Sequence, residues 1–471
     1  MAKDLRDFLA LLEKRDRGEL VRISREVDPI HEVPVIQQKL AAAGAYPVLY
    51  FEHIRGSQIP LVTNLWGSYD LLGLALDVTE PKSKAEILFE YMRREDAARP
   101  VKEVPASQAP VKQVILKGRE VDLSLLPITK HAEKDAGRYI VVGGLVTRDP
   151  QTGILNVGMY RHEVRENRAI LCMMNPAHHG AYIYRRHKEM RKPMEVALFI
   201  GYHPAVGIGM LSRGPIEMNE YEVMGGLLGE PLEVVRAETV DLPVPARSEI
   251  VIEGTINFAK ETLDGPFAEY TGYYGHKAPS AWLDVSCVSM RRDAIYHDLD
   301  PAHREHNFAG VLCEESAIYR QVKNVVPSVR AVHLPVSGRC LYHIYVSISK
   351  RLQGEGKMAG LAAISAAVNA KHVFVVDDDV DIYNDEEVLW AVATRLEADI
   401  GLSTISHCTG AHLDPSAYGE KRFERGHMTT KMIVDATRPA TLPFSERITP
   451  PADVWARIKL EDYIEGWTPR N

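Results

Sequence analysis

In the first hundred residues, some stretches have apolar residues at the spacing typical of helices and others at the spacing typical of strands. Apolar residues recur at helical spacing from Leu5 to Leu12, directly after an aspartate, a residue type that favours the N-cap position. The stretch LVRIS at 20–24 has the length and composition of a strand. Both patterns end in the charged, proline-bearing stretch 93–110, whose composition is typical of a linker. We therefore predict an N-terminal α/β domain over residues 1–110.

Residues 111–310 consist mostly of short β-rich runs that are closed by turn residues. This pattern favours a β-barrel or a strongly curved sheet with a few inserted helices. We treat the stretch as a second domain. Its β-rich runs are YIVVGGLVT, ILNVGMY, EVALFIGYH, SEIVIEGTINF and WLDVSCVSM.

The pattern changes after residue 310. A helix rich in small residues is predicted over 360–370, a buried strand over 372–376 and a second helix over 385–396, which is a βα-type arrangement. We therefore predict a C-terminal α/β domain over 311–471. Its tail, PPADVWARIKLEDYIEGW, opens with prolines that suit the start of a helix.

Composition narrows the class of protein. Apolar residues make up 45% of the 471 residues and charged residues 25%, which are globular values, and the net charge of -8 argues against a nucleic-acid binder. The charged N-terminus does not resemble a signal peptide, and no apolar run approaches the ~18 to 20 residues of a membrane span. Five scattered cysteines without a C-x-x-C pair fit a reducing environment. We expect a soluble, cytoplasmic protein without a membrane partner.

The stretch LDGPFAEYTGYYG at 263–275 places two carboxylates, Asp264 and Glu269, on either side of a Gly-Pro turn. The two acids converge if the turn doubles the chain back, and a glutamate held among apolar groups can deliver a proton. The alternative is a solvated surface turn. The neighbouring Phe267 and three tyrosines favour a lined pocket instead.

Two other regions carry candidate ligands. A strand-like run, ILNVGMYR, ends with Asn156 and Arg161, and an arginine at a strand end can clamp a carboxylate or phosphate. The segments NPAHHGAY and MLSRGPIEMNEYE add adjacent histidines and several glutamates, and one Asn, one His and one Glu would suit Mn²⁺ or Mg²⁺.

A run of aspartates, Asp377 to Asp381, follows the strand predicted at 372–376. It resembles the acidic, metal-binding strand end of some transferases, which keeps a metal-dependent transferase as an alternative from another enzyme class. Aspartates before a helix also serve as N-caps and solubilising charges.

In this order along the chain, the segments resemble the UbiD family of decarboxylases, which use prenylated FMN. The segments are NxGMYR, NEYExxGGLLGEP, ETVDLPVPARSEIVIEG, DGPFAEYTGYY and AKHVFVVDDDVDIYN. The resemblance implies a mixed α+β fold in which a central split β-barrel binds the flavin. An N-terminal α/β region and a C-terminal α/β domain with a terminal helix would flank this barrel.

The resemblance also implies catalytic roles. Arg161, Asp264 and Glu269 resemble the family's carboxylate-arginine-carboxylate triad, in which Glu269 would be the proton donor. Family members commonly carry Glu at both acidic places, or Glu then Asp, whereas this chain has Asp then Glu. It is therefore an open question at this stage whether the shorter Asp264 reaches Arg161.

Cofactor sites follow from the same resemblance. Mn²⁺ or Mg²⁺ would be held by Asn156, His179 and Glu220, with His178 and Glu222 as rivals for the last two places. Lys371 would contact the flavin phosphate, and Ser212 would belong to a K⁺ site. The cofactor-binding set is completed by Met159, Tyr160 and Arg161.

An electron sink is needed because loss of CO₂ from an sp² carbon leaves an anion that is not delocalised. Prenylated FMN would supply this sink. Arg161 would hold the substrate carboxylate, Asp264 would orient Arg161, and Glu269 would protonate the carbon. The implied activity is the reversible, non-oxidative decarboxylation of an aromatic or heteroaromatic acid.

The substrate is less defined. The run IYHDLDPAHREHNFAG contains His297, His303, Arg304 and His306. Many relatives that act on hydroxybenzoates carry a proline where this chain has Arg304. If Arg304 faced the pocket, it could bind a second carboxylate, as in furan-2,5-dicarboxylate. The alternatives are that Arg304 pairs with Glu305 or another acid, and that the substrate is a hydroxybenzoate, a phenolic acid or an acrylic acid.

The resemblance implies two kinds of protein partner. A flavin prenyltransferase would supply the cofactor. The chain itself would form a homodimer, which in some relatives assembles into a hexamer. We expect the tail helix near Trp455 to Trp467 to contact a neighbouring subunit, the alternative being a helix docked on its own chain.

Overall fold

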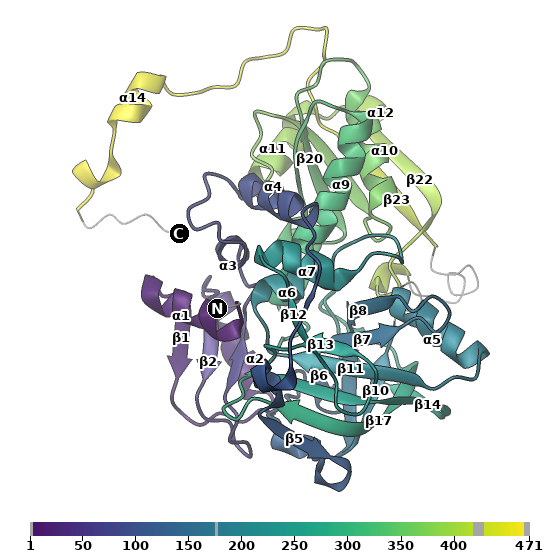
Figure 1. Cartoon of the computed structure of the whole chain (residues 1–471). Helices are drawn as coiled ribbons and strands as arrows, with labels where there is room; N and C mark the ends of the chain where they lie inside the picture. Colours follow the sequence, from purple (N-terminus) through teal and green to yellow (C-terminus); the bar gives the residue numbers. More distant parts are fainter. Residues whose placement is uncertain (1–2, 175–177, 418–427, 466–471) are drawn as a thin grey trace.

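The computed structural model describes residues 3–174, 178–417 and 428–465 (Figure 1). Trp467, which was expected in the tail contact, lies outside these residues. Within the described part, no helix has the length and apolar character needed to cross a membrane.

The N-terminal stretch folds as helices packed around a small sheet. Asp4 caps α1 as predicted and accepts the amides of Arg6 and Asp7. The sheet has the order β1-β2-β3-β18, and its last strand, β18 (Tyr296–His297), comes from much later in the chain. The other elements are α1 (Leu5–Arg15), β1 (Leu20–Ile23), α2 (Glu32–Ala42), β2 (Val48–Phe51), β3 (Leu61–Thr63), α3 (Tyr69–Ala75) and α4 (Lys84–Glu95).

The stretch 93–110 is more ordered than the linker that its composition predicted. Helix α4 continues to Glu95, and β4 (Lys102–Glu103) pairs in parallel with β12 (Glu233–Arg236), which also pairs with β13 (Pro243–Pro245). Both residues of β4 are exposed. Backbone pairing holds this segment, so no apolar pattern marks it in the sequence.

The central stretch forms the predicted strongly curved sheet (Figure 1). Eight strands follow the order β6-β9-β10-β17-β14-β11-β7-β8, and β5 also pairs with β17. Register shifts interrupt the long β14–β17 pair at Glu253/Gly254 and at Asn257/Glu261, and such bulges bend a strand and increase its twist. The strands are β5 (Val114–Lys117), β6 (Tyr139–Ile140), β7 (Gly144–Arg148), β8 (Leu155–Met159), β9 (Arg161–Glu166), β10 (Ala169–Met173), β11 (Met194–Ile200), β14 (Ile250–Asp264) and β17 (Ala278–Met290).

Three helices and a short hairpin complete the central stretch. The helices are α5 (His179–Glu189), α6 (Pro204–Gly209) and α7 (Glu220–Leu228). The hairpin pairs β15 (Phe267–Ala268) with β16 (Tyr274–Gly275) and leads from β14 to β17. This hairpin therefore contains the Gly-Pro turn between Asp264 and Glu269 that was identified in the sequence.

The C-terminal stretch is the predicted α/β unit. Its sheet has the order β19-β20-β21-β23-β22, in which β20, β21 and β23 are parallel. The strand predicted at 372–376 and the helix predicted at 385–396 are confirmed as β21 and α11. The helix predicted at 360–370 is present as α10, but it begins and ends earlier than predicted, at Glu355 and Ala366. The elements are α8 (Arg304–Ala309), α9 (Val311–Val325), β19 (Val329–His333), β20 (His343–Ile348), α10 (Glu355–Ala366), β21 (His372–Asp377), α11 (Asp385–Arg395), α12 (Ala398–Gly401), β22 (Leu402–Thr409) and β23 (Met428–Asp435).

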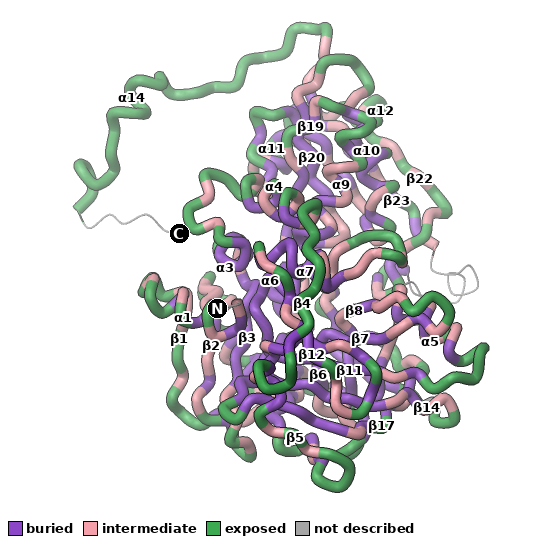
Figure 2. The backbone as a smooth tube through the Cα atoms, in the orientation of Figure 1, coloured by how far each residue is buried: buried purple, intermediate pink, exposed green. Residues whose placement is uncertain are grey.

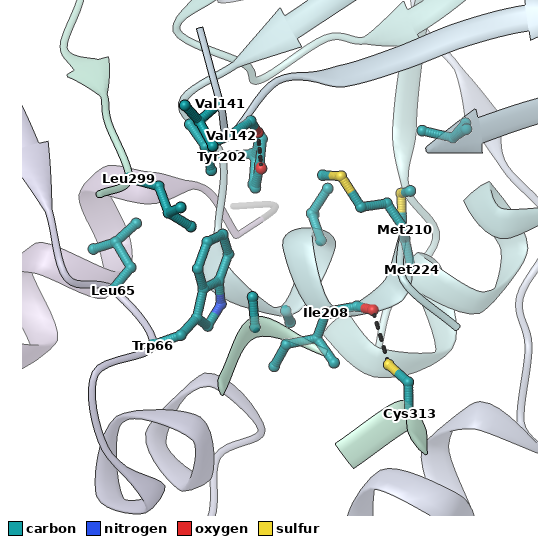
Figure 3. Close-up of a cluster of buried hydrophobic side chains, with 14 of the residues drawn as sticks. Leu65, Trp66, Val141, Val142, Tyr202, Ile208, Met210, Met224, Leu299 and Cys313 are labelled. Carbon is teal, nitrogen blue, oxygen red and sulfur yellow. Dashed lines mark hydrogen bonds between the residues drawn. The ribbon is translucent and has the colours of Figure 1, made fainter. Parts of the chain in front are cut away.

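One continuous hydrophobic core joins the three stretches. The fully buried Trp66 donates from Nε1 to the carbonyl of Pro204 over 3.1 Å. Cys313 of α9 donates from Sγ to the carbonyl of Ile208, and Tyr202 donates to the carbonyl of Val142 (Figure 3). The central sheet and its neighbours are thus held in one arrangement, which fixes the walls of the site described below.

The tail leaves this body. After β23 the chain runs away from the sheet to α14 (Ala452–Arg457), and every described residue from 441 onward is exposed (Figure 2). The predicted helix start after the prolines is confirmed, since α14 begins directly after Pro451.

Candidate active site

A cavity of about 410 Å³ lies between the curved central sheet and the C-terminal stretch. Its walls come from β8, β9, the acidic hairpin, α8, α9 and the loops at 339–341 and 412–413. This cavity is lined by many of the candidate site residues predicted from the sequence. These are Asn156, Met159, Tyr160, Arg161, His178, His179, Ser212, Glu220 and Glu269.

Arg161 joins the two acids of the hairpin. It is the first residue of β9, and it donates from Nη1 to Oε1 of Glu269 and from Nη2 to Oδ1 of Asp264. The aspartate at 264 therefore reaches the arginine although it is one methylene shorter than glutamate. Oδ2 of Asp264 and Nε of Arg161 have no protein partner and are buried. The guanidinium thus has two strong contacts and can still bind a further anion.

Burial sets the protonation of this group. Asp264 is 0%, Glu269 6% and Arg161 8% exposed. Burial raises the pKa of Glu269 to about 7; the positive charge of Arg161 opposes this effect and the charge of Asp264 adds to it. Burial also raises the pKa of Asp264. Glu269 can therefore hold or release a proton near neutral pH, which is what a general acid requires.

A backbone conformation and two ring contacts hold the acidic hairpin against Arg161. Gly265 has φ +92°, a conformation that L side chains rarely adopt, which explains the glycine in the turn. The ring of Phe267 packs against the Arg161 guanidinium at 5.0 Å and against the Tyr139 ring at 4.4 Å. The part of the hairpin that bears the two acids is thus packed and not a solvated turn, and Tyr270 lines the cavity as expected. Tyr273 and Tyr274, in contrast, are exposed and do not line the cavity.

A second group of polar side chains lines another part of the cavity. Asn156 of β8 donates from Nδ2 to Oε1 of Glu220 over 2.8 Å, and the amide of Val157 donates to Oε2 over 3.2 Å. Oδ1 of Asn156 is buried without a partner. Burial raises the pKa of Glu220 to about 7, and no ion pair to Glu220 occurs in the part of the chain that the structure describes. A cation bound there would give Oδ1 of Asn156 a partner and would neutralise the buried carboxylate of Glu220.

The donor set fits a hard divalent cation. Oxygen donors from Asn156 and Glu220 and a neutral imidazole from His178 or His179 suit Mn²⁺ or Mg²⁺. Among the described residues, no three His, Cys, Asp or Glu side chains cluster closely enough to hold a metal, so the amide oxygen of Asn156 would be essential. Residues 175–177, which open the NPAHHGAY segment, lie outside the described part.

The rivals for these places differ in position. Glu220 lines the cavity and is buried, whereas Glu222 does not line it and accepts from Nδ2 of Asn219 over 3.1 Å. Both His178 and His179 line the cavity. Ser212 lines it as well, with Oγ 2.9 Å from the hydroxyl of Tyr91.

Lys371 lies beside the cavity but not in its wall. Its Nζ is 2.9 Å from Oδ2 of Asp414 and 2.7 Å from Oγ of Ser416. Asn369, two residues before it, does line the cavity. The phosphate contact that was expected of Lys371 would thus require it to leave Asp414.

The three residues expected to bind substrate lie outside the cavity wall. His297 is fully buried between the rings of Trp66 (5.2 Å) and Tyr202 (5.5 Å). Nδ1 of His303 accepts the amide of Glu305 at the start of α8. Packing against the N-terminal stretch holds both residues in place.

Arg304 is also held outside the cavity, so the structure supports neither the expected contact with a second carboxylate nor the alternative pairing with Glu305. Its guanidinium lies over the Tyr46 ring at 3.9 Å and over the Phe308 ring at 4.6 Å. Glu305 instead accepts from Nε2 of Gln37 and from the amide of Asn64.

Arg339 lines the cavity, although no motif in the sequence pointed to it. It has φ +57° at the end of a short turn, and its Nη2 lies so close to Gly272 that a β-carbon there would be 2.5 Å away. Gly272 in turn donates its amide to the carbonyl of Glu269 over 2.9 Å. Tertiary packing alone brings this cation to the hairpin that bears Glu269.

The aspartates after β21 form ion pairs with arginines. Arg395 donates to Asp377 over 2.8 Å and to both oxygens of Asp379 over 2.9 Å, and Arg438 lies 3.4 Å from Asp377. These carboxylates are already neutralised by two cations. The arrangement disfavours the alternative of a metal-dependent transferase.

Comparisons with known proteins agree with the resemblance. A model of the "3-octaprenyl-4-hydroxybenzoate carboxy-lyase Rift-related domain" matches residues 102–324. Models of the C-terminal and N-terminal domains of the same carboxy-lyase match residues 306–436 and 11–92.

Solved structures and sequence relatives extend this match over the chain. The UbiD-class enzyme HmfF from Pelotomaculum thermopropionicum in complex with FMN is 37% identical, with a TM-score of 0.91 and coverage of 98% of this chain and 100% of that chain. Vanillic acid decarboxylase from Sedimentibacter hydroxybenzoicus in its closed form is 30% identical, with a TM-score of 0.85 and coverage of 99% and 100%. Anhydromevalonate phosphate decarboxylase from Methanothermobacter thermautotrophicus is 33% identical over 83% of this chain and 88% of its own length.

Proposed function

Because the chain belongs to the UbiD family of carboxy-lyases, we propose that it is a prenylated-FMN-dependent decarboxylase of an aromatic or heteroaromatic carboxylic acid. The reaction is reversible and non-oxidative, and its substrate carboxyl group is on an sp² carbon. The observation that carries the proposal is the buried Arg161 between Asp264 and Glu269 at the wall of a 410 Å³ cavity.

Each member of the triad has a role that its contacts support. Arg161 binds the substrate carboxylate, because its guanidinium borders the cavity and has more N–H groups than its two carboxylate partners occupy. Asp264 is fully buried and orients Arg161. Glu269 delivers the proton that replaces CO₂ on the substrate carbon, since its pKa of about 7 leaves much of it protonated near neutral pH.

The cavity is suited to a flavin with a divalent cation. Asn156, Glu220 and His179 would hold Mn²⁺ or Mg²⁺, with His178 as the rival ligand, and Met159, Tyr160 and Ser212 would line the flavin site, Ser212 beside a K⁺ ion. Prenylated FMN supplies the electron sink for the carbanion when bound. Support comes from the FMN complex of HmfF and from an evolved dimeric form of that enzyme in complex with prFMN, which is 35% identical.

The substrate class we favour is a diacid such as furan-2,5-dicarboxylate. Support comes from the positive charge of Arg339, which lines the cavity close to the Glu269 hairpin. A hydroxybenzoate, a phenolic acid or an acrylic acid is the alternative within the family. Decarboxylases of vanillic acid and of phenolic acid are among the relatives.

The assembly and location complete the proposal. We propose a homodimer, or a hexamer built from dimers, with the exposed tail as a subunit contact. A flavin prenyltransferase would supply the cofactor in the cytoplasm. None of the five cysteines forms a disulfide, which fits that reducing compartment.

A screen for CO₂ release tests the function. The chain would be co-expressed with a flavin prenyltransferase, its cofactor identified by mass and absorption, and the enzyme assayed with furoates, furan dicarboxylate, benzoates, pyrrole carboxylates and cinnamates. We expect turnover of at least one of these acids. A flavin-loaded protein that releases no CO₂ from any of them would contradict the proposal.

A further inference from the structure

The loop before β6 carries a buried carboxylate to which no role has been assigned above. Asp135 is 3% exposed and accepts the amide of Ala268 at Oδ1 and the amide of Ala132 at Oδ2, both over 2.8 Å. Ala268 immediately precedes Glu269. A second backbone contact runs the other way, from the amide of Ala136 to the carbonyl of Pro266 over 2.9 Å. The loop and the acidic hairpin are thus bonded to each other around Asp135.

A buried Glu163 makes the matching contact at the other end of the turn. It is 1% exposed, accepts the amide of Gly265 over 3.3 Å and the hydroxyl of Tyr139 over 3.1 Å, and pairs with Arg165 at 3.0 Å. Glu163 therefore has a cation beside it. No ion pair to Asp135 occurs among the described residues, and its negative charge acts on the buried His131 as well as on Glu269.

We propose that Asp135 is a positioning residue for the decarboxylation, which fixes the backbone at Glu269 through the Ala268 amide and adds a buried negative charge to the surroundings of the acid. This inference rests on the proposed function. The role in fixing the backbone is supported by the hydrogen bond from the Ala268 amide to Oδ1 of Asp135. Asp135 is among the charges that raise the pKa of Glu269, after burial and the charge of Asp264, which supports the role of its charge.

Other charged and titratable groups act on Glu269 from the elements packed around it. Arg161 of β9 favours the carboxylate, and Asp264 of β14 favours the protonated form. Removal of the Asp135 charge should therefore lower the pKa of Glu269 without abolishing its function. Other titratable or charged groups that contact the hairpin or its neighbours are Lys134, Tyr139, Glu163, Arg165, Tyr270, His306 and Arg339.

Two substitutions at position 135 change charge and position to different degrees. Asp135→Asn removes the charge and keeps one acceptor oxygen, which can hold the Ala268 amide if the Ala132 amide loses its partner. We therefore expect the alkaline limb of the kcat/KM profile to move down by ~0.5 to 1 pH unit. Asp135→Glu keeps the charge but displaces the carboxylate oxygen that accepts the Ala268 amide. We therefore expect kcat to fall about tenfold or more, while the alkaline limb of the kcat/KM profile stays at the same pH. Asp149→Asn is the matched control, because Asp149 is also 3% exposed and holds loop amides at Gln151 and Thr152.

Two measurements on the apo chain make the test independent of turnover. Carbon-13 NMR of labelled glutamate, with Glu269→Gln as the assignment variant, should show a lower Glu269 pKa in Asp135→Asn and no change in Asp149→Asn. Hydrogen exchange at Ala268 should be faster in Asp135→Glu. An unchanged Glu269 pKa in Asp135→Asn, or unchanged exchange at Ala268 in Asp135→Glu, would overturn the inference. A wild-type chain without decarboxylase activity would contradict the proposed function and leave these NMR and exchange results standing.

Discussion

Gly275 lies directly against the carboxylate of Glu269, so that a β-carbon at position 275 would be 3.0 Å from Oε1 and 3.1 Å from Cγ. The same β-carbon would lie 3.5 Å from Nη1 of Arg161. Glycine at this point of β16 therefore leaves the space in which the acid and the arginine meet.

Gly275→Ala should misplace the Glu269 carboxylate without unfolding the protein. We expect kcat to fall by ~10- to 100-fold, because a shift of a few tenths of an ångström is enough to disturb a buried charged contact. Steady-state kinetics and the melting temperature are the measurements. Gly137→Ala is the control, since its β-carbon would meet neighbours at an ordinary 3.6 Å or more. Equal losses in both variants would contradict the explanation.

The pH profile should report Glu269. Its pKa is raised to about 7, and the protonated form is the proton donor, so decarboxylation should decline as the pH rises above about 7. Glu269→Gln should lower kcat by ~10²- to 10⁴-fold, because it removes the donor. The pH dependence of kcat/KM and the rate of the variant are the measurements. A variant with full activity would exclude Glu269 as the acid.

The divalent cation should bind the apo chain through Asn156 and Glu220. We expect Mn²⁺ to raise the melting temperature and Glu220→Ala to abolish this rise, because the buried carboxylate would be the charged ligand. Glu222→Gln is the matched control, as Glu222 does not line the cavity. Parallel measurements on His178→Ala and His179→Ala would show which imidazole binds. Loss of the Mn²⁺ effect in Glu222→Gln but not in Glu220→Ala would reverse the assignment.

The distal carboxylate of a diacid should depend on Arg339 more than on Arg304. Arg339 lines the cavity, whereas Arg304 is stacked between Tyr46 and Phe308. We expect Arg339→Gln to raise the KM for furan-2,5-dicarboxylate by ~10-fold or more and to leave 2-furoate nearly unchanged, since one charge-assisted contact is lost. Arg304→Gln should affect both acids alike. A selective loss of diacid binding in Arg304→Gln would show that Arg304 turns into the cavity when substrate binds.

The exposed tail should be required for assembly. Trp455 is 74%, Tyr463 68% and Ile448 97% exposed, which is costly for large apolar side chains without a partner. Arg447, in contrast, is anchored on the body, 4.4 Å from the Trp390 ring and paired with Glu387. We expect deletion of residues 448–471 to convert the oligomer to smaller species, as measured by light scattering after size exclusion. An unchanged mass would place the subunit contact elsewhere.

The sequence by itself determined the local structure and the chemical types at the site. Hydrophobic periodicity marked helices and strands such as α1, α11 and β21, because burial imposes a period on each of them. The spacing of Asp264 and Glu269 around a Gly-Pro pair marked a turn that could join two acids. The order of five segments pointed to the family, since each segment keeps residue types that one chemistry requires.

Only the tertiary structure decided which of these residues meet. Arg161 lies more than a hundred positions from Asp264 and Glu269, and the pairing of β9, β10, β17 and β14 brings them together. The same packing excluded Arg304 from the cavity wall, because two aromatic rings hold it, and brought Arg339 and Asp135 to the acidic hairpin. Hydrophobic periodicity reports local secondary structure, whereas contacts between residues far apart in the chain produce no periodic pattern. Such contacts depend on how the elements pack, so only the tertiary structure reveals them.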